Sequence, residues 1–282
     1  MPYFPADFLK QQRINNGYYD PQNIDDLPNY WGLPQSVFFC KNCTYTNQLP
    51  SSFPEFKHTL DRICPTLPFD EEGICNACYY NEKMKGKIDW VKRENELMKL
   101  LDLYRKDDGS YDCIVPGSGG KDSAYQSHIL KYKYGMHPLT ITWPPIMYTD
   151  YGKQNFENWI DIGGFDNVTY RPNGRVHKLL TRLSILNILH PFQSFILGQK
   201  GLASKLAMKF DIPLIFYGEN DAEYNNPIAD NETSLRDKSF HTINELDNLY
   251  IGGVSIAELK EKHGLNGNDL SLYLPAYYKE FE

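Results

Sequence analysis

Positions 118–123, Ser-Gly-Gly-Lys-Asp-Ser, combine glycines, a cation, a carboxylate and two hydroxyls just after the apolar run 111–116. Glycine permits positive φ angles, and its backbone can approach an anion closely because it has no side chain. A helix beginning near Asp122 would add unpaired N–H groups and the positive end of its dipole, and Lys121 would add a full charge. The stretch therefore predicts a loop that binds phosphate or pyrophosphate.

Two common nucleotide loops do not fit this stretch. A Walker A loop requires glycine where Val115 stands and serine or threonine where Asp122 stands. The dinucleotide pattern G-x-G-x-x-G, counted from Gly117, also fails at Asp122. A plain glycine turn, followed by a helix capped by Asp122 or Ser123, remains an alternative at this point.

A second group of residues consists of two C-x-x-C pairs, formed by Cys40, Cys43, Cys75 and Cys78. Four thiolates at this spacing could hold one tetrahedral zinc ion, and such a closed site would be structural rather than catalytic. Cys64 could replace one ligand. Buried free cysteines and an iron–sulfur site are the alternatives.

Strand-like and helical segments alternate from position 111 onward, after a predicted helix that ends near Gly109. The strand-like runs lie at 111–116, 137–143, 166–171 and 212–218, the last expected to be a buried strand. Such alternation predicts an α/β fold: a parallel sheet with helices on both faces. We expect three parts: an irregular arm (1–36), a zinc-binding module (37–88) and an ATP-binding α/β domain (89–282).

Charge and hydropathy narrow the class of protein. The net charge of −7 and the pI near 5.5 argue against a general nucleic-acid binder, and Lys and Arg look scattered along the sequence. The N-terminus lacks the basic start and apolar run of a signal peptide, and no stretch approaches a membrane span. We therefore expect a cytoplasmic protein without a membrane partner.

The pattern S-G-G-x-D-S resembles the PP-loop of the ATP pyrophosphatase superfamily, whose members cleave ATP to AMP and pyrophosphate to activate a carbonyl oxygen. Three further stretches make the chain similar to the N-acetyl sugar amidotransferase family of that superfamily. They are P-F-D-E-E-G-I-C-N-A-C at 68–78, T-I-T-W-P-P at 140–145 and I-P-L-I-F-Y-G-E-N-D-A-E-Y at 212–224. The resemblance spans roughly the region 40–224.

The resemblance implies an enzyme that converts an N-acetyl group of a sugar into an acetamidino group in lipopolysaccharide or nonulosonic-acid biosynthesis, using ATP and Mg²⁺. It implies catalytic roles for Lys121, Asp122 and Ser123, with Asp122 positioning magnesium. It implies nucleotide contacts from Pro116, Gly117, Ser118, Gly119, Gly120, Trp143, Gly198, Gln199 and Lys200, the last three at the start of a helix. It implies sugar contacts from Glu219, Asn220 and Glu223. Packing is the alternative role for Trp143, and a solvated loop the alternative for the acidic residues.

The resemblance also implies a separate glutaminase subunit, similar to that of imidazole glycerol phosphate synthase, with a cyclase-like channel subunit. Cys113 lies inside a predicted strand, so we interpret it as a core residue rather than a glutaminase nucleophile. Family members usually continue beyond this C-terminus, so we expect either a missing lobe or a naturally short protein. A tRNA-modifying PP-loop enzyme of the lysidine-forming or thiolating type, and a zinc-ribbon interaction protein with a regulatory nucleotide loop, remain alternatives.

Overall fold

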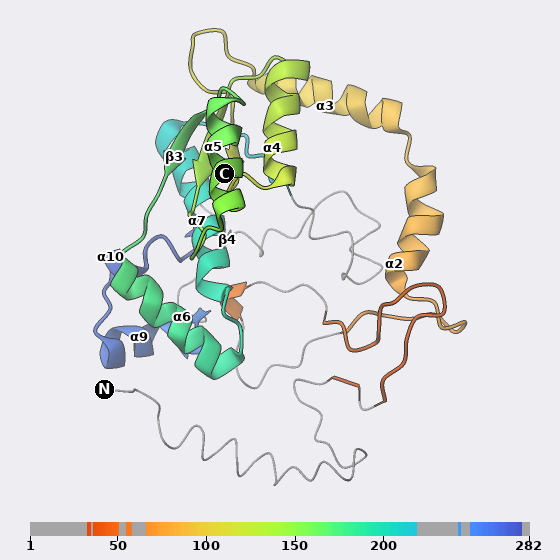
Figure 1. The fold of residues 1–282 in the computed structure, drawn as a ribbon, viewed down its shortest axis with the longest axis vertical. Coiled ribbons are helices and arrows are strands. Elements are labelled where there is room, and N and C mark those ends of the chain that lie inside the picture. The colour runs from red at the N-terminus through yellow and green to blue at the C-terminus, as the bar shows by residue number, and fades with distance from the viewer. Residues whose placement is uncertain are drawn as a thin grey trace.

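The computed structural model describes residues 33–34, 36–50, 55–57, 66–218, 242–243 and 249–277 of the 282-residue chain (Figure 1). The predicted sugar-contacting residues Glu219, Asn220 and Glu223, and the spare Cys64, lie outside these ranges. Among the described helices, none has the length and apolar character needed to cross a membrane.

A parallel sheet of three strands forms the centre of the fold. Its order is β1 (Cys113–Pro116), β2 (Pro138–Thr142) and β3 (Asp166–Thr169). On the side of β1 opposite β2, the Ile114 N–H donates to the Leu214 carbonyl oxygen (2.8 Å), and the Phe216 N–H donates to the Ile114 carbonyl oxygen (2.8 Å). The chain thus adds two strands on one side of β1 and later returns to its other side in parallel.

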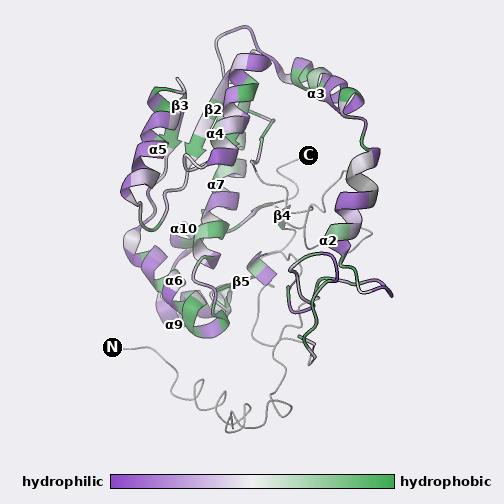
Figure 2. Ribbon diagram, turned by 45° about the vertical axis from the view of Figure 1, so that its right-hand side comes forward, coloured by the Kyte–Doolittle hydropathy of each residue, from purple (hydrophilic) through white to green (hydrophobic). Residues whose placement is uncertain are grey.

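Helices pack on both faces of β1, as the alternation of its side chains requires. Ile114 belongs to one core, with residues of α6 and α7. Cys113 and Val115 belong to a second core, with α3 and the segment that follows α4. The helix bounds are α3 Trp90–Tyr104, α4 Lys121–His128, α5 Asp150–Asp161, α6 Gly174–Ile188 and α7 Gln193–Phe210. In Figure 2 these helices carry both hydrophilic and hydrophobic segments, as expected of helices with one buried side.

The remaining elements are short. They are η2 Glu55–Lys57, α2 Asn76–Tyr79, η3 Tyr80–Met84, η4 Lys85–Lys87, η5 Ile129–Lys133, β4 Thr242–Ile243, β5 Tyr250–Ile251, β6 Val254–Ser255, α9 Ile256–His263, α10 Gly267–Leu270 and β7 Ala276–Tyr277. Strands β4 and β7 pair in parallel, whereas β5 and β6 form an antiparallel pair.

The predicted alternation of strands and helices, and the parallel sheet, are confirmed, but two details were wrong. The helix before the last strand begins at Gln193, so Gly198, Gln199 and Lys200 lie inside α7 rather than at its start. Glycine is needed inside this helix because a Cβ at position 198 would lie 2.3 Å from Cε2 of Trp143. The segment 212–218 was expected to be a buried strand, yet it forms only an isolated parallel bridge between Ile215 and Ile114, and Leu214, Ile215 and Phe216 are only half-buried.

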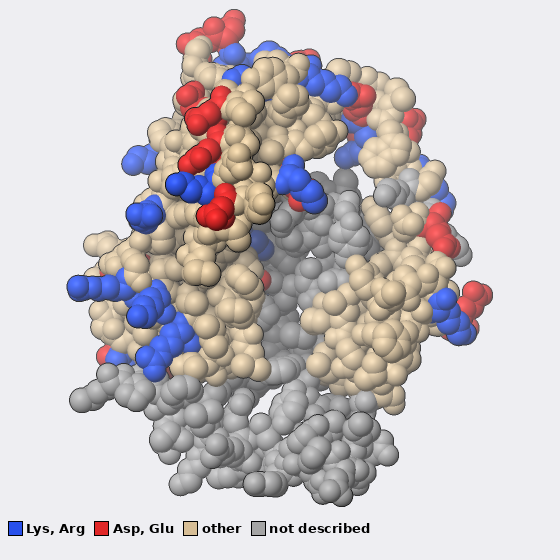
Figure 3. Space-filling model, in the orientation of Figure 1, with Lys and Arg blue, Asp and Glu red and all other residues tan. Residues whose placement is uncertain are grey.

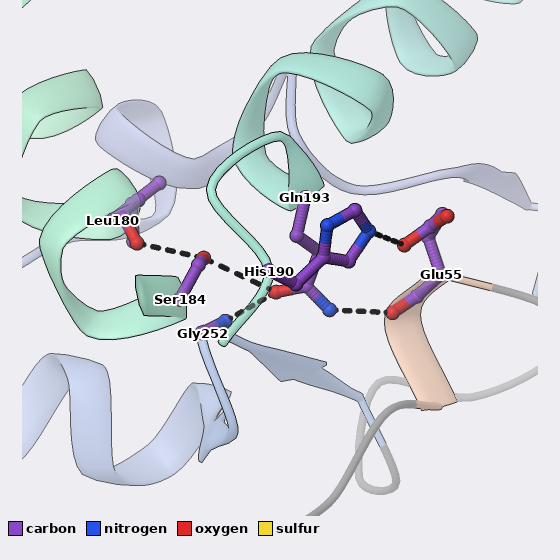
Figure 4. A network of polar contacts seen from close by, with 6 residues as sticks. All are labelled: Glu55, Leu180, Ser184, His190, Gln193 and Gly252. Carbon is purple, nitrogen blue, oxygen red and sulfur yellow. Dashed lines mark hydrogen bonds and ion pairs between the residues drawn. The ribbon is translucent and has the colours of Figure 1, made fainter. Parts of the chain in front are cut away.

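A buried glutamine ties three separate segments together (Figure 4). The side-chain oxygen of Gln193 accepts a hydrogen bond from the Gly252 N–H (2.6 Å), and its nitrogen donates to the Glu55 carbonyl oxygen (2.7 Å). His190 Nε2 lies 3.1 Å from Glu55 Oε2, and the Ser184 hydroxyl also contacts Gln193 Oε1 (3.4 Å). Residues 55–57 are therefore fastened to α7 and to the hairpin formed by β5 and β6.

We expect Gln193→Leu to lower the free energy of unfolding by about 2–5 kcal/mol. The substitution preserves volume but removes the hydrogen bonds of Gln193 with the Gly252 N–H and the Glu55 carbonyl, at about 1–3 kcal/mol each. Urea unfolding followed by circular dichroism measures this change. Gln199→Leu, in the same helix but only half-buried, is the matched control and should cost far less. An equal loss in both variants would contradict the proposed role of the Gln193 network.

Candidate active site and metal centre

The glycine loop follows β1 and holds a backbone shape that only glycine tolerates at two positions. Gly119 has φ +83°, and a Cβ on it would lie 2.5 Å from the Phe156 Cα in α5. A Cβ on Gly117 would lie 2.5 Å from the Ser123 hydroxyl oxygen, while one on Gly120 would meet nothing within 4 Å. The loop therefore packs closely against α4 and α5 and leaves open space beside Gly120.

Helix α4 begins at this open space without a side-chain cap. Its N-cap residue is Gly120, and no side chain accepts a hydrogen bond there. The Ser123 hydroxyl instead donates to the Gly120 carbonyl oxygen (3.1 Å). Neither Asp122 nor Ser123 caps the helix, in contrast to the plain capped turn considered from the sequence. The first turn thus presents the positive end of its dipole to the surface beside the loop.

Two oppositely charged side chains flank this helix start. Lys121 Nζ lies 2.7 Å from Asp122 Oδ1, and the two side chains are 88% and 48% exposed. An ion pair this exposed contributes little to stability. Both groups are therefore accessible to a ligand that carries phosphate and a divalent cation. The carboxylate of Asp122 is the type of ligand that Mg²⁺ prefers.

The segment 212–218 reaches the same helix start from the other side of β1. A Cβ on Gly218 would lie 3.1 Å from the Ser123 nitrogen, and Gln126 Nε2 donates to the Tyr217 carbonyl oxygen (2.9 Å). In parallel sheets, ligands bind beyond the carboxyl ends of the strands where the chain changes direction. The glycine loop lies at such a point, because β2 and the segment 212–216 flank β1 on opposite sides.

Other predicted nucleotide contacts lie in the core. Trp143 is 2% exposed, stacks on Tyr170 (centroids 5.6 Å apart) and meets Tyr273 edge-on (5.3 Å). Its ring covers Gly198, so these two predicted residues are neighbours, and its indole N–H has no hydrogen-bond partner among the residues that the structure describes. Gln199 is half-buried, and Lys200 lines a pocket together with Glu55 and Tyr273.

Two residues that support the loop were not identified from the sequence. Trp159 Nε1 donates to the Ser127 hydroxyl (2.7 Å), and the Trp159 ring would lie 2.8 Å from a Cβ on Gly117. The Ser127 hydroxyl also donates to the Ser123 carbonyl oxygen (2.8 Å). The spacing Ser123–Ser127, one helical turn on the same face, was the sequence signal for this support.

The four predicted cysteine ligands come together. The sulfur atoms of Cys40, Cys43, Cys75 and Cys78 all lie within 4.8 Å of one another, and none of the four thiols is in a disulfide. The Cys40–Cys78 and Cys43–Cys75 sulfur distances are 4.0 and 3.6 Å. A tetrahedral zinc ion with Zn–S bonds of about 2.3 Å holds its sulfurs about 3.8 Å apart. The residues therefore fit a single metal ion such as zinc.

Local backbone turns position these thiols. The first pair lies in a turn closed by the Phe39–Thr46 bridge, and the second begins at the Phe69–Cys75 bridge, where Cys75 is the N-cap of α2. Backbone N–H groups point at the sulfurs: those of Asn42 and Cys75 donate to Cys40 Sγ (3.4 and 3.2 Å). Such donors stabilise thiolates and would orient them toward a metal.

The thiol pKa values follow from this crowding. Burial raises the pKa of Cys40, but backbone N–H groups of Cys75, Asn42 and Cys43 outweigh it and lower the pKa to about 6. Burial and the neighbouring thiols raise the pKa of Cys78 to about 12. All four sulfurs can ionise together only with a cation between them. In β1, burial and the charge of Asp112 raise the pKa of Cys113 to about 12, which confirms it as an unreactive core thiol.

Replacing Cys75 by serine should abolish stoichiometric metal binding, because a serine hydroxyl stays protonated and is a poor zinc ligand. We expect about one zinc per chain in the unaltered protein, measured by elemental analysis after dialysis against a weak chelator. Cys113→Ala is the control and should retain its metal, since Cys113 lies in β1. Undiminished zinc in Cys75→Ser would mean that these cysteines are not the ligands.

Two of the three glycines of the loop provide a matched pair of variants. Gly119→Ala should destabilise the protein by about 2–5 kcal/mol, since alanine is strained at positive φ and its Cβ overlaps Phe156. Gly120→Ala, with φ −68° and open space, should change stability by less than about 0.5 kcal/mol. Thermal and urea unfolding measure both effects. Equal stability of the two variants would contradict the described loop shape.

Comparison with known proteins gives little functional information. No family model matches the sequence. The chain is 32% identical over 75 residues to an uncharacterized protein of Methanocaldococcus jannaschii. That match covers 27% of this chain and 26% of the length of that relative, so it leaves about three quarters of each protein unmatched.

Proposed function

We propose that this protein is an ATP-dependent, AMP-forming amidotransferase that converts the N-acetyl group of a sugar into an acetamidino group. The observation that carries the proposal is the loop 117–123. Its glycine-dependent backbone and uncapped helix start lie where β1 ends between two parallel neighbours, with Lys121 and Asp122 exposed beside it. Such a site suits the phosphates of a nucleotide. The sugar acceptor rests on the family resemblance of the sequence.

The chemistry explains why ATP is required. An amide carbonyl is a poor electrophile, and its oxygen is a poor leaving group. In the proposed reaction the amide oxygen attacks the α-phosphorus of ATP, and the bond between the α- and β-phosphates breaks to release pyrophosphate. Ammonia then adds to the activated carbon, AMP leaves with the former amide oxygen, and loss of a proton gives the acetamidino group.

Some residues of the loop would bind the phosphates of ATP, and others would offset their negative charge. Backbone N–H groups at 118–120 and the Ser123 hydroxyl would hold the pyrophosphate portion of ATP. Lys121, whose side chain extends into solvent, would offset negative charge that builds up on the phosphates. Asp122 would hold Mg²⁺, which when bound shields the phosphate charge from the attacking oxygen.

Ammonia has no evident source within the described chain. A glutaminase needs an accessible, ionisable cysteine, whereas Cys113 is fully buried and its pKa is raised to about 12. The other described cysteines face one another in the metal centre. We therefore propose that a separate glutaminase subunit, with a channel-forming partner, supplies ammonia.

Mass spectrometry with Mg²⁺-ATP, ammonium chloride and a panel of N-acetylated nucleotide sugars tests the reaction and its acceptor together. The expected product has one oxygen replaced by an NH group, and it forms with equal amounts of AMP and pyrophosphate. ADP formation, or AMP formation with no altered sugar in the panel, would contradict the proposal.

Asp122→Asn should slow pyrophosphate release about 100-fold, because an amide binds Mg²⁺ more weakly than a carboxylate does, with little effect on folding. Asp161→Asn, at the far end of α5 and also exposed, is the control and should retain full activity. A coupled pyrophosphate assay and the melting temperature of each variant are the measurements. Full activity of Asp122→Asn would contradict the role assigned to the loop.

A further inference from the structure

Positive charge is concentrated in one part of this acidic protein. Between Asp166 and Asp211 lie 44 residues without a single Asp or Glu, and they contain seven Lys and Arg. The whole chain has 29 Lys and Arg against 36 Asp and Glu, so the remainder carries a net charge of −14. The stretch without Asp or Glu includes most of β3 and all of α6 and α7.

Helix α6 aligns three of these cations on its outer side, and a fourth lies just before the helix. Arg175, Lys178 and Arg182 are spaced by three and four residues, so they share one helix face, and Arg171 precedes them. All four are exposed, while Val176, Leu180 and Leu183 on the opposite face are buried. Lys and Arg side chains gather over α6 on the face seen in Figure 3. We call Arg171, Arg175, Lys178 and Arg182 the α6 stripe.

The α6 stripe is a poor candidate for a purely structural role. No ion pair among the described residues involves its members, and α6 itself contains no acidic residue to pair with them. Arg175 and Arg182 are about 10 Å apart along the helix axis, a convex line rather than a pocket. Such a line suits a ligand with repeated negative charges better than a single phosphate.

We propose that the α6 stripe binds the phosphate backbone of a single-stranded nucleic acid. Uniform positive charge matches a partner of uniform negative charge. Exposed aromatic rings lie in sequence at both ends of the stripe: Tyr170 (38% exposed) precedes it, and Phe192 (57% exposed) follows α6. Aromatic rings beside a basic line are the features on which unpaired bases stack. This surface is independent of the proposed sugar amidation.

An acidic amphipathic polypeptide is the competing occupant. Ile185 and Leu189 continue the spacing of the stripe with exposed apolar side chains, which a protein partner could cover. Positions 167–210 contain no Asp or Glu, and the regular spacing of Arg175, Lys178 and Arg182 along the helix matches the repeated charges of a phosphate backbone, so the nucleic acid is favoured. The experiment below includes this alternative as an outcome.

Fluorescence anisotropy with labelled single-stranded RNA and DNA of about 20 nucleotides tests the proposal. Four phosphate contacts predict a slope of about −3 for log K against log salt, a loss of about fifty-fold in affinity between 50 and 200 mM. Replacing Arg175, Lys178 and Arg182 together by glutamine should weaken binding at least tenfold and reduce the slope by about 2. Comparing the affinities for RNA and for DNA shows which nucleic acid the protein prefers.

The control variant replaces Lys92, Lys99 and Lys153 by glutamine, which changes the net charge equally at exposed positions on α3 and α5. It should bind as the unaltered protein does. An equal loss in both triple variants, or a salt slope shallower than −1, would overturn the proposal. Displacement of the RNA by polyglutamate at equal charge concentration would also overturn it and indicate an acidic polypeptide partner.

Discussion

The candidate active site depends on the parallel pairing of β1 with a neighbour on each side. Because β2 and the segment 212–216 both hydrogen-bond to β1, the backbone leaving β1 is held from two directions. The Gly117 N–H donates to the Ile141 carbonyl oxygen (2.9 Å), and Gly218 packs on the first turn of α4. A side chain would overlap Ser123 at position 117 and the backbone of α5 at position 119, where φ is also positive, so this exit requires glycine at both positions. Sheet order thus determines the loop geometry.

Much of this arrangement could be predicted from sequence because the signals were local. Strand–loop–helix order around 111–128 and the two C-x-x-C pairs follow from spacing within a few residues, and the structure confirms the strand, the helix and the clustering of the thiols. The start of α7 could not be predicted, since glycine normally weakens a helix interior and Gly198 is kept there by a ring from β2's exit. For Trp143, the packing role considered as the alternative from the sequence agrees with its burial.

The α6 stripe shows how a signal can be present in a sequence and still be missed. Four cations spread over twelve positions look scattered when counted along the chain. The three within α6, Arg175, Lys178 and Arg182, align only after the 3.6-residue period of the helix is applied and the buried face is known. The missing acidic residues, by contrast, needed no structure, since the stretch from 167 to 210 is visible in the charge pattern alone.

The hydrogen bonds of Gln193 restrain the long stretch of chain between the two cysteine pairs, and this restraint has a consequence for stability. Residues 55–57 lie between Cys43 and Cys75 in the sequence, and they are fixed to α7 and the β5–β6 hairpin. A metal ion held by the four cysteines and the contacts of residues 55–57 with the α/β core would therefore both restrain the chain between the cysteine pairs, and each restraint would reduce the conformational entropy left for the other to remove. Binding and folding are then reciprocally linked: occupancy of the cysteine site adds to the stability of the sheet and helices, and any ligand that stabilises α7 raises the affinity of the cysteines for metal.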